Sequence, residues 1–243
     1  MSKNSHIGVS LWLMPPPNSL LGDALTSTIN GLKPLFHDAP GFAPHITITS
    51  NIAVSRQNTQ RHVASILDRA CAAAASVDHL DVIVTGIVFN GTQFFKKVYF
   101  QVQQRSELLS LALISREEFV YLPELQQKAR QEQTWAESNR PANSQAPAAP
   151  APVSPEQNEA LVQEAAQRAS TWVRNDYDPH VSLVYSSIYP IDEAVQQTID
   201  TRLRDVFGDN YAEKGIGWTG GRLALVECEG PVEQWKVLGY RDI

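Results

Sequence analysis

Two short segments of the sequence carry a histidine followed two residues later by a hydroxyl residue. The first is PHITI, with His45 and Thr47, and the second is PHVSL, with His180 and Ser182. A single His-x-Ser/Thr match is expected by chance in a chain of this size, but two matches with the same proline and aliphatic flanks are not. The pair is therefore a specific candidate for a functional site.

These residue types suit chemistry at a phosphate. In a strand, residues i and i+2 point the same way, so each motif places an imidazole beside a hydroxyl. One histidine can take a proton from water while the other gives a proton to the leaving oxygen, because an imidazole has a pKa near ~6.5. The hydroxyls of Thr47 and Ser182 can donate to phosphate oxygens. The sequence leaves the two roles open, and we favour His180 as base and His45 as acid.

A metal centre is not predicted, and neither is a cofactor. No third histidine, cysteine or carboxylate accompanies either motif at metal-ligand spacing. The chain has only two cysteines, Cys71 and Cys228, which we expect to be reduced and structural.

The elements that must position these residues follow from the spacing of apolar residues. Strands are predicted over 6–14, 45–50, 80–89, 98–102, 180–186, 221–228 and 233–239. Helices are predicted from 18 or 19 to 32, within 55–76, over 106–133 with a break at Pro123, from an N-cap at Ser154 past Trp172, and over 192–207.

The order of these elements predicts an α+β protein in which the two halves resemble each other. Each half has a strand that begins with Pro-His, then a helix, then two strands. We expect one bilobal domain over 1–243, with pseudo-two-fold symmetry, two antiparallel sheets facing a central cleft, and helices outside. Residues 141–155 are rich in proline and alanine and carry no charge, which predicts an exposed loop.

The composition of the chain limits the kinds of partner that it is expected to bind. Hydrophobic residues make up 43% of the 243 residues and charged residues 19%, as in a folded globular protein. The net charge of -6 argues against binding to duplex nucleic acid. No apolar run is long enough for a transmembrane helix, and no signal peptide is recognised, so we expect an intracellular, cytosolic protein. We also expect a monomer that binds a small nucleotide.

The sequence resembles the two-histidine (2H) phosphoesterase superfamily, which is defined by two H-x-[ST] motifs in a bilobal fold. Within it, the chain is most similar to fungal and plant cyclic nucleotide phosphodiesterases. The resemblance rests on LWLMPP, PHITITS, the Thr85-Gly86 strand with its Phe94-Phe95 loop, PHVSLVY and RLALVECEGPVEQW. It does not extend over 123–155, where this chain carries an insertion.

This resemblance implies a function. The family hydrolyses ADP-ribose 1″,2″-cyclic phosphate to ADP-ribose 1″-phosphate, and nucleoside 2′,3′-cyclic phosphates to 2′-phosphates, without a metal. It implies a link to tRNA splicing products, and it allows a peripheral association with the Golgi. By motif position, His45 and His180 are the acid/base pair, Thr47 and Ser182 contact the phosphate, and Tyr185 contacts the ligand.

Several alternatives stay open at the level of sequence. Strict alternation places Tyr185 on the face opposite His180, where it would pack in the core. Trp12 could stack on a base or belong to the core, and the 94–97 segment (FFKK) could contact a nucleotide or form a solvated turn. The function itself has two alternatives: an RNA end-processing enzyme that acts on oligonucleotides, and a nucleotide-binding module without catalysis.

Overall fold

A computed structural model describes residues 6–89, 96–138, 154–187 and 190–243. The chain divides into two compact units, one formed by Met1–Ala112 with Asp178–Ile243 and the other by Leu113–Tyr177. Both histidine motifs belong to the first unit. The predicted Pro/Ala-rich loop lies outside the described residues except for its last two positions, and the predicted single catalytic domain stays a prediction.

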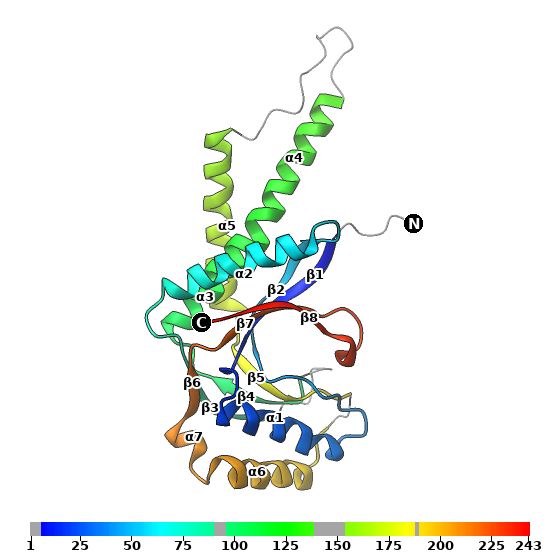
Figure 1. Ribbon diagram of the computed structural model, residues 1–243, viewed down its shortest axis with the longest axis vertical. Coiled ribbons are helices and arrows are strands. Elements are labelled where there is room, and N and C mark those ends of the chain that lie inside the picture. Colours follow the sequence, from blue (N-terminus) through cyan, green and yellow to red (C-terminus); the bar gives the residue numbers. More distant parts are fainter. Residues whose placement is uncertain (1–5, 90–95, 139–153, 188–189) are drawn as a thin grey trace. The chain divides into compact units, whose positions relative to one another are not determined.

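The first unit contains two four-stranded sheets in its described residues, and every paired strand in them is antiparallel. One sheet has the order β2-β1-β7-β8, and the other has the order β5-β4-β3-β6 (Figure 1). The strands are β1 (His6–Met14), β2 (Ile46–Ser55), β3 (Asp81–Phe89), β4 (Val98–Val102), β5 (His180–Val184), β6 (Ile216–Thr219), β7 (Arg222–Glu227) and β8 (Lys236–Asp242).

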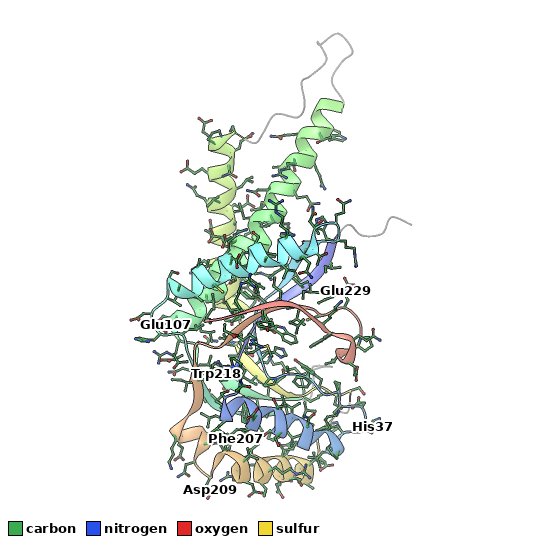
Figure 2. All side chains as sticks on the ribbon, in the orientation of Figure 1. His37, Glu107, Phe207, Asp209, Trp218 and Glu229 are labelled. Carbon is green, nitrogen blue, oxygen red and sulfur yellow. The ribbon has the colours of Figure 1, made fainter. Side chains whose placement is uncertain are left out.

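Helices cover both sheets. α1 (Leu20–Leu32) contacts β5 and α6 (Glu193–Phe207), while α2 (Thr59–Ala75) contacts β2, β7 and β8 (Figure 1). Phe207 at the end of α6, labelled in Figure 2, meets the ring of Phe100 on β4 with centroids 5.7 Å apart. The short helix α7 (Tyr211–Lys214) adds Tyr211 to this contact. The motif residues therefore lie on sheets whose helix-facing sides are filled with apolar side chains.

The second unit begins within α3 (Ser106–Arg116) and is helical in its described residues. α3 continues through a π-helical segment, Glu117–Tyr121, into α4 (Leu122–Ser138), and α5 (Pro155–Asn175) contacts α4. The predicted break at Pro123 is thus a π-helical segment that precedes the proline, since proline cannot supply the regular helical N–H donor.

α5 begins with the predicted cap. Ser154 Oγ accepts from Gln157 N, and Gln157 Oε1 accepts from Ser154 N, both at 3.2 Å. This reciprocal pair is a capping box, and Pro155 occupies the first turn, where its missing N–H is tolerated.

The α+β class with two antiparallel sheets is confirmed. The sequence did not predict β6 or α7, which are only four residues long each. The two halves also exchange strands: β7 and β8 from the second half join β1 and β2, while β3 and β4 join β5. This exchange places one histidine motif on each sheet.

Candidate functional site

His45 immediately precedes β2 and is buried, with 4% of its surface exposed. Its Nδ1 lies 2.7 Å from the carbonyl oxygen of Ala43, two residues earlier. A carbonyl can only accept, so Nδ1 carries a hydrogen, and the neutral ring keeps its lone pair on Nε2. The backbone thereby fixes both the orientation and the tautomer of His45.

His180 is held in the same way. It is the first residue of β5, and its Nδ1 lies 2.7 Å from the carbonyl oxygen of Asp178, again two residues earlier. The ring edge contacts Tyr99 on β4, with centroids 5.2 Å apart. Both motifs therefore present an imidazole with Nε2 available for proton transfer.

The structure brings the two imidazoles to one site. β2 and β5 belong to different sheets but contact each other. The pKa of His45 is lowered to about 4, chiefly because burial disfavours the charged ring, and the charge of His180 lowers it further. Burial also lowers the pKa of His180. The charge of His180 thus affects the protonation of His45, which places the two rings close to each other.

Each hydroxyl residue lies two positions after its histidine, Thr47 on β2 and Ser182 on β5. Thr47 pairs with Trp12 across the β1–β2 ladder, and Ser182 pairs with Tyr99 across the β4–β5 ladder. Ser182 is buried with 2% of its surface exposed, and its hydroxyl shares a hydrogen bond with that of Tyr185. Each motif therefore presents a ring and a hydroxyl from one strand face, as the alternation predicts.

Tyr185 reaches the site because β5 contains a bulge. Tyr99 pairs with Ser182 and Val98 pairs with Val184, so Leu183 is one extra residue on β5. The extra residue reverses the alternation after it, which returns Tyr185 to the side of Ser182. Strict alternation alone would have placed Tyr185 in the core.

Aromatic side chains form one wall of the site. The indole of Trp12 stacks on His45 and meets the edge of Trp235, with centroids 5.7 Å apart. Phe42 contacts His45 at 6.3 Å and Tyr185 at 4.3 Å between ring centroids. Neither Phe42 nor Trp235 was predicted as a site residue from the sequence. Phe42 lies three residues before His45, and Trp235 ends the segment RLALVECEGPVEQW, which contributes to the family resemblance.

A cation lies beside the second motif. Lys96 Nζ is 3.1 Å from a carboxylate oxygen of Asp178 and 4.3 Å from the centroid of the Tyr99 ring. Its charge lowers the pKa of His180, although less than burial does. Lys97 is buried, whereas Phe94 and Phe95, also considered as nucleotide contacts, lie outside the described residues.

The described residues contain neither a metal-binding cluster nor a membrane-spanning helix. No group of three or more His, Cys, Asp or Glu residues among them is arranged to hold a metal ion. No helix among them is long and apolar enough to cross a membrane.

The fold and the paired motifs are those of a two-histidine phosphoesterase, and comparisons with known proteins agree. The family model described as "Cyclic phosphodiesterase-like protein" matches residues 7–243. The chain therefore belongs to this family, and the predicted enzyme class, a cyclic phosphodiesterase that hydrolyses cyclic phosphates, is confirmed.

Curated relatives match over nearly their whole length. A protein of Yarrowia lipolytica named 2′,3′-cyclic-nucleotide 3′-phosphodiesterase is 51% identical over 236 residues, covering 97% of this chain and 100% of the relative. A Candida albicans protein with the same name is 36% identical, covering 98% and 100% of the two chains. One from Debaryomyces hansenii is 36% identical, covering 90% and 99%.

Proposed function

We propose that this protein hydrolyses nucleoside 2′,3′-cyclic phosphates to nucleoside 2′-phosphates, and ADP-ribose 1″,2″-cyclic phosphate to ADP-ribose 1″-phosphate, without a metal. The observation that carries the proposal is the matched pair of imidazoles, each with Nδ1 donating to the carbonyl two residues before it. The names of the relatives support the first substrate class. The resemblance described above supports the second.

In the proposed reaction of a nucleoside 2′,3′-cyclic phosphate, water attacks phosphorus and the bond from phosphorus to O3′ breaks. One histidine takes a proton from the water, and the other gives a proton to O3′. The hydroxyls of Thr47 and Ser182 donate to the non-bridging oxygens as negative charge develops there. The protons balance, because one imidazole gains the proton that the other loses.

The environment of the two rings favours a particular distribution of roles. His45 is the more buried ring, and its pKa of about 4 keeps it neutral over most of the physiological range. A neutral imidazole is ready to act as a base. We therefore assign the base to His45 and the acid to His180, the reverse of the distribution favoured by the sequence alone.

The family resemblance also supports a biological setting for the proposal. The cyclic phosphates would be products of tRNA splicing, and the enzyme would act in the cytosol as a monomer, with a peripheral association with the Golgi. The net charge of -6 favours a small nucleotide over an oligonucleotide as substrate.

The decisive experiment is turnover of both substrate classes by the purified protein in the presence of EDTA. His45→Gln and His180→Gln should each lower kcat by at least ~100-fold, the usual contribution of a positioned acid or base. His62→Gln is the matched control, because His62 also uses Nδ1 in a backbone contact, with Ser55 N at 3.2 Å, but belongs to neither motif. Activity that requires a divalent ion, or near-normal turnover in either motif variant, would refute the mechanism.

A further inference from the structure

A cavity adjoins the site at Tyr185. It has a volume of about 200 Å³ and is lined by Asp38, Pro40, Tyr185, Ser186, Ser187, Pro231, Val232 and Glu233. Tyr185 connects it to the motifs, because its hydroxyl shares a hydrogen bond with Ser182 and its ring contacts Phe42. A substrate whose phosphate lies between the imidazoles therefore has this cavity as a neighbouring compartment.

One wall of the cavity is held in place by Asp38. Its carboxylate accepts hydrogen bonds from Ser186 Oγ at 2.5 Å, from Ser187 N at 2.7 Å and from the Ser187 hydroxyl. Burial raises the pKa of Asp38, but these hydrogen bonds outweigh it and lower the pKa to about 2. The carboxylate thus remains charged, and the serine hydroxyls are directed toward it.

The other wall offers a hydrogen-bond acceptor. Glu233 is exposed at the cavity, and no donor to its carboxylate is found among the described residues. The cavity lining includes two carboxylates and no basic residue. Such a lining repels phosphate groups and favours an uncharged group with N–H donors.

Size restricts the ligand further. The cavity is smaller than the roughly 300 to 1,000 Å³ of sites for drug-sized ligands. It has room for one heterocycle, with the ring of Tyr185 and the apolar surfaces of Pro40, Pro231 and Val232 to contact it. A diphosphate together with a second nucleoside would extend beyond it.

We propose that this cavity binds the base of a nucleoside 2′,3′-cyclic phosphate, with the Glu233 carboxylate accepting a hydrogen bond from an amino group of the base. This inference rests on the proposed function and ranks its two substrate classes. The protein then prefers nucleoside 2′,3′-cyclic phosphates to ADP-ribose 1″,2″-cyclic phosphate. In the latter, the diphosphate is attached to the reacting ribose and meets the acidic lining of the cavity.

The kinetic test compares three substrates: adenosine 2′,3′-cyclic phosphate, ADP-ribose 1″,2″-cyclic phosphate, and methyl riboside 2,3-cyclic phosphate, which lacks a base. Glu233→Gln should lower kcat/KM for the adenosine substrate by about tenfold, the scale of one hydrogen bond to a charged group, and leave the base-free substrate unchanged. Glu233→Lys should in addition raise kcat/KM for the ADP-ribose substrate.

The matched control is Glu229→Gln, which removes the same charge four residues away. Glu229 is labelled in Figure 2, lies 3.6 Å from Arg56 and does not line the cavity. Equal effects of Glu233→Gln on the adenosine and base-free substrates would overturn the inference. So would equal effects of the Glu233 and Glu229 variants.

A binding measurement separates this inference from the proposed function. Calorimetry with adenosine 2′-phosphate and with ADP-ribose 1″-phosphate needs no turnover. Glu233→Gln should weaken binding of adenosine 2′-phosphate and leave that of ADP-ribose 1″-phosphate unchanged or stronger. If the wild-type protein turned over none of the three substrates, the proposed function would fail, and this result would still support or overturn the base site.

Discussion

The indole of Trp12 lies flat on the imidazole of His45, with ring centroids 3.5 Å apart and planes within 6° of parallel. The indole covers one face of the imidazole, and the Ala43 carbonyl fixes its Nδ1 edge. One face of the Trp12 indole therefore packs against His45 of the same chain. There the indole holds the imidazole in place and excludes water from it. This contact contributes to the burial that lowers the pKa of His45.

Replacing Trp12 should release that burial. In Trp12→Leu, water reaches the ring, so the pKa of His45 should rise from about 4 toward ~6.5. We expect kcat to fall at least about tenfold, because the ring loses its fixed orientation. The pKa is measured by NMR titration of the His45 ring protons. Trp12→Phe keeps a stacking ring and should retain most of the depression, whereas an unchanged pKa in the leucine variant would contradict this role.

The pH profile of kcat/KM should be bell-shaped, with its maximum on the acid side of neutral pH. The reaction needs one neutral and one protonated imidazole, and the pKa values of both rings are lowered from 6.5 in the free enzyme, that of His45 to about 4. The reactive form is therefore most abundant above the pKa of His45 and below that of His180. A steady-state pH profile with its maximum above pH 7 would contradict this assignment.

The corresponding profile of kcat should lie at higher pH. It reports the enzyme–substrate complex, where the anionic phosphate next to the rings favours their charged forms and raises both pKa values. Coincident profiles for kcat and kcat/KM would show that the phosphate does not lie beside the imidazoles.

The contact between Tyr185 and Ser182 can be tested by removing one hydroxyl at a time. Burial raises the pKa of Tyr185 to about 12, so its hydroxyl stays protonated. Tyr185→Phe should lower kcat/KM by about tenfold, because the Ser182 hydroxyl loses the partner that orients it toward the phosphate. The double variant with Ser182→Ala should cost no more than Ser182→Ala alone. Additive losses would show that the two hydroxyls act independently.

The sequence predicted those parts of the site that depend on local spacing. His45 with Thr47, and His180 with Ser182, follow from the two-residue period of a strand. The neighbourhood of Tyr185 could not be derived in this way, because it depends on Leu183 being an extra residue in the ladder with β4. A bulge is a property of the pairing of two strands, and the sequence of one strand does not contain it.

Long-range contacts were also beyond the sequence analysis. Phe42 and Trp235 are separated by almost the whole chain, yet both meet the ring of Tyr185. The exchange of β7 and β8 into the sheet of β1 and β2 brings Trp235 there, and no local pattern predicts that exchange. In contrast, the cap at Ser154 was predicted correctly, because all of its contacts lie within three residues.

Asp38 connects the segment before the first motif to the segment after the second. Its carboxylate binds Ser186 and Ser187, which directly follow Tyr185. Asp38→Ala should raise KM and lower kcat, because Tyr185 and the cavity wall lose their anchor. Asp38→Asn, which keeps one acceptor oxygen, should recover part of the loss.

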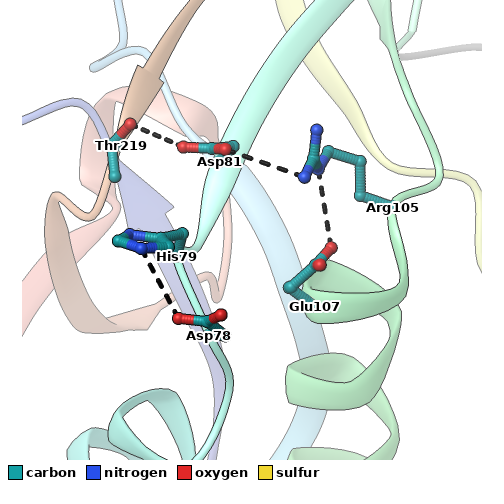
Figure 3. A network of polar contacts seen from close by, with 6 residues as sticks. All are labelled: Asp78, His79, Asp81, Arg105, Glu107 and Thr219. Atoms are coloured by element: carbon teal, nitrogen blue, oxygen red, sulfur yellow. Dashed lines mark hydrogen bonds and ion pairs between the residues drawn. The ribbon is translucent and has the colours of Figure 1, made fainter.

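Asp81 provides the matched control. It accepts a hydrogen bond from Thr219 Oγ1 at 2.6 Å and lies 3.7 Å from Arg105, which in turn pairs with Glu107 (Figure 3). This network joins the start of β3 to β6 and to the segment between β4 and α3, and it includes no residue of either histidine motif. Asp81→Ala should therefore lower the free energy of unfolding, measured with urea, by an amount similar to Asp38→Ala, about 1 to 3 kcal/mol, but leave kcat/KM within about twofold.

Coupling to Tyr185 separates positioning from simple destabilisation. If Asp38 acts through Tyr185, the loss of kcat/KM caused by Tyr185→Phe should largely disappear in the Asp38→Ala background and persist in the Asp81→Ala background. Steady-state kinetics on the four corresponding variants measures this coupling. A full additional loss in the Asp38→Ala background would mean that Asp38 stabilises the fold without orienting Tyr185. A purely structural residue lowers the folded fraction equally whether position 185 holds tyrosine or phenylalanine.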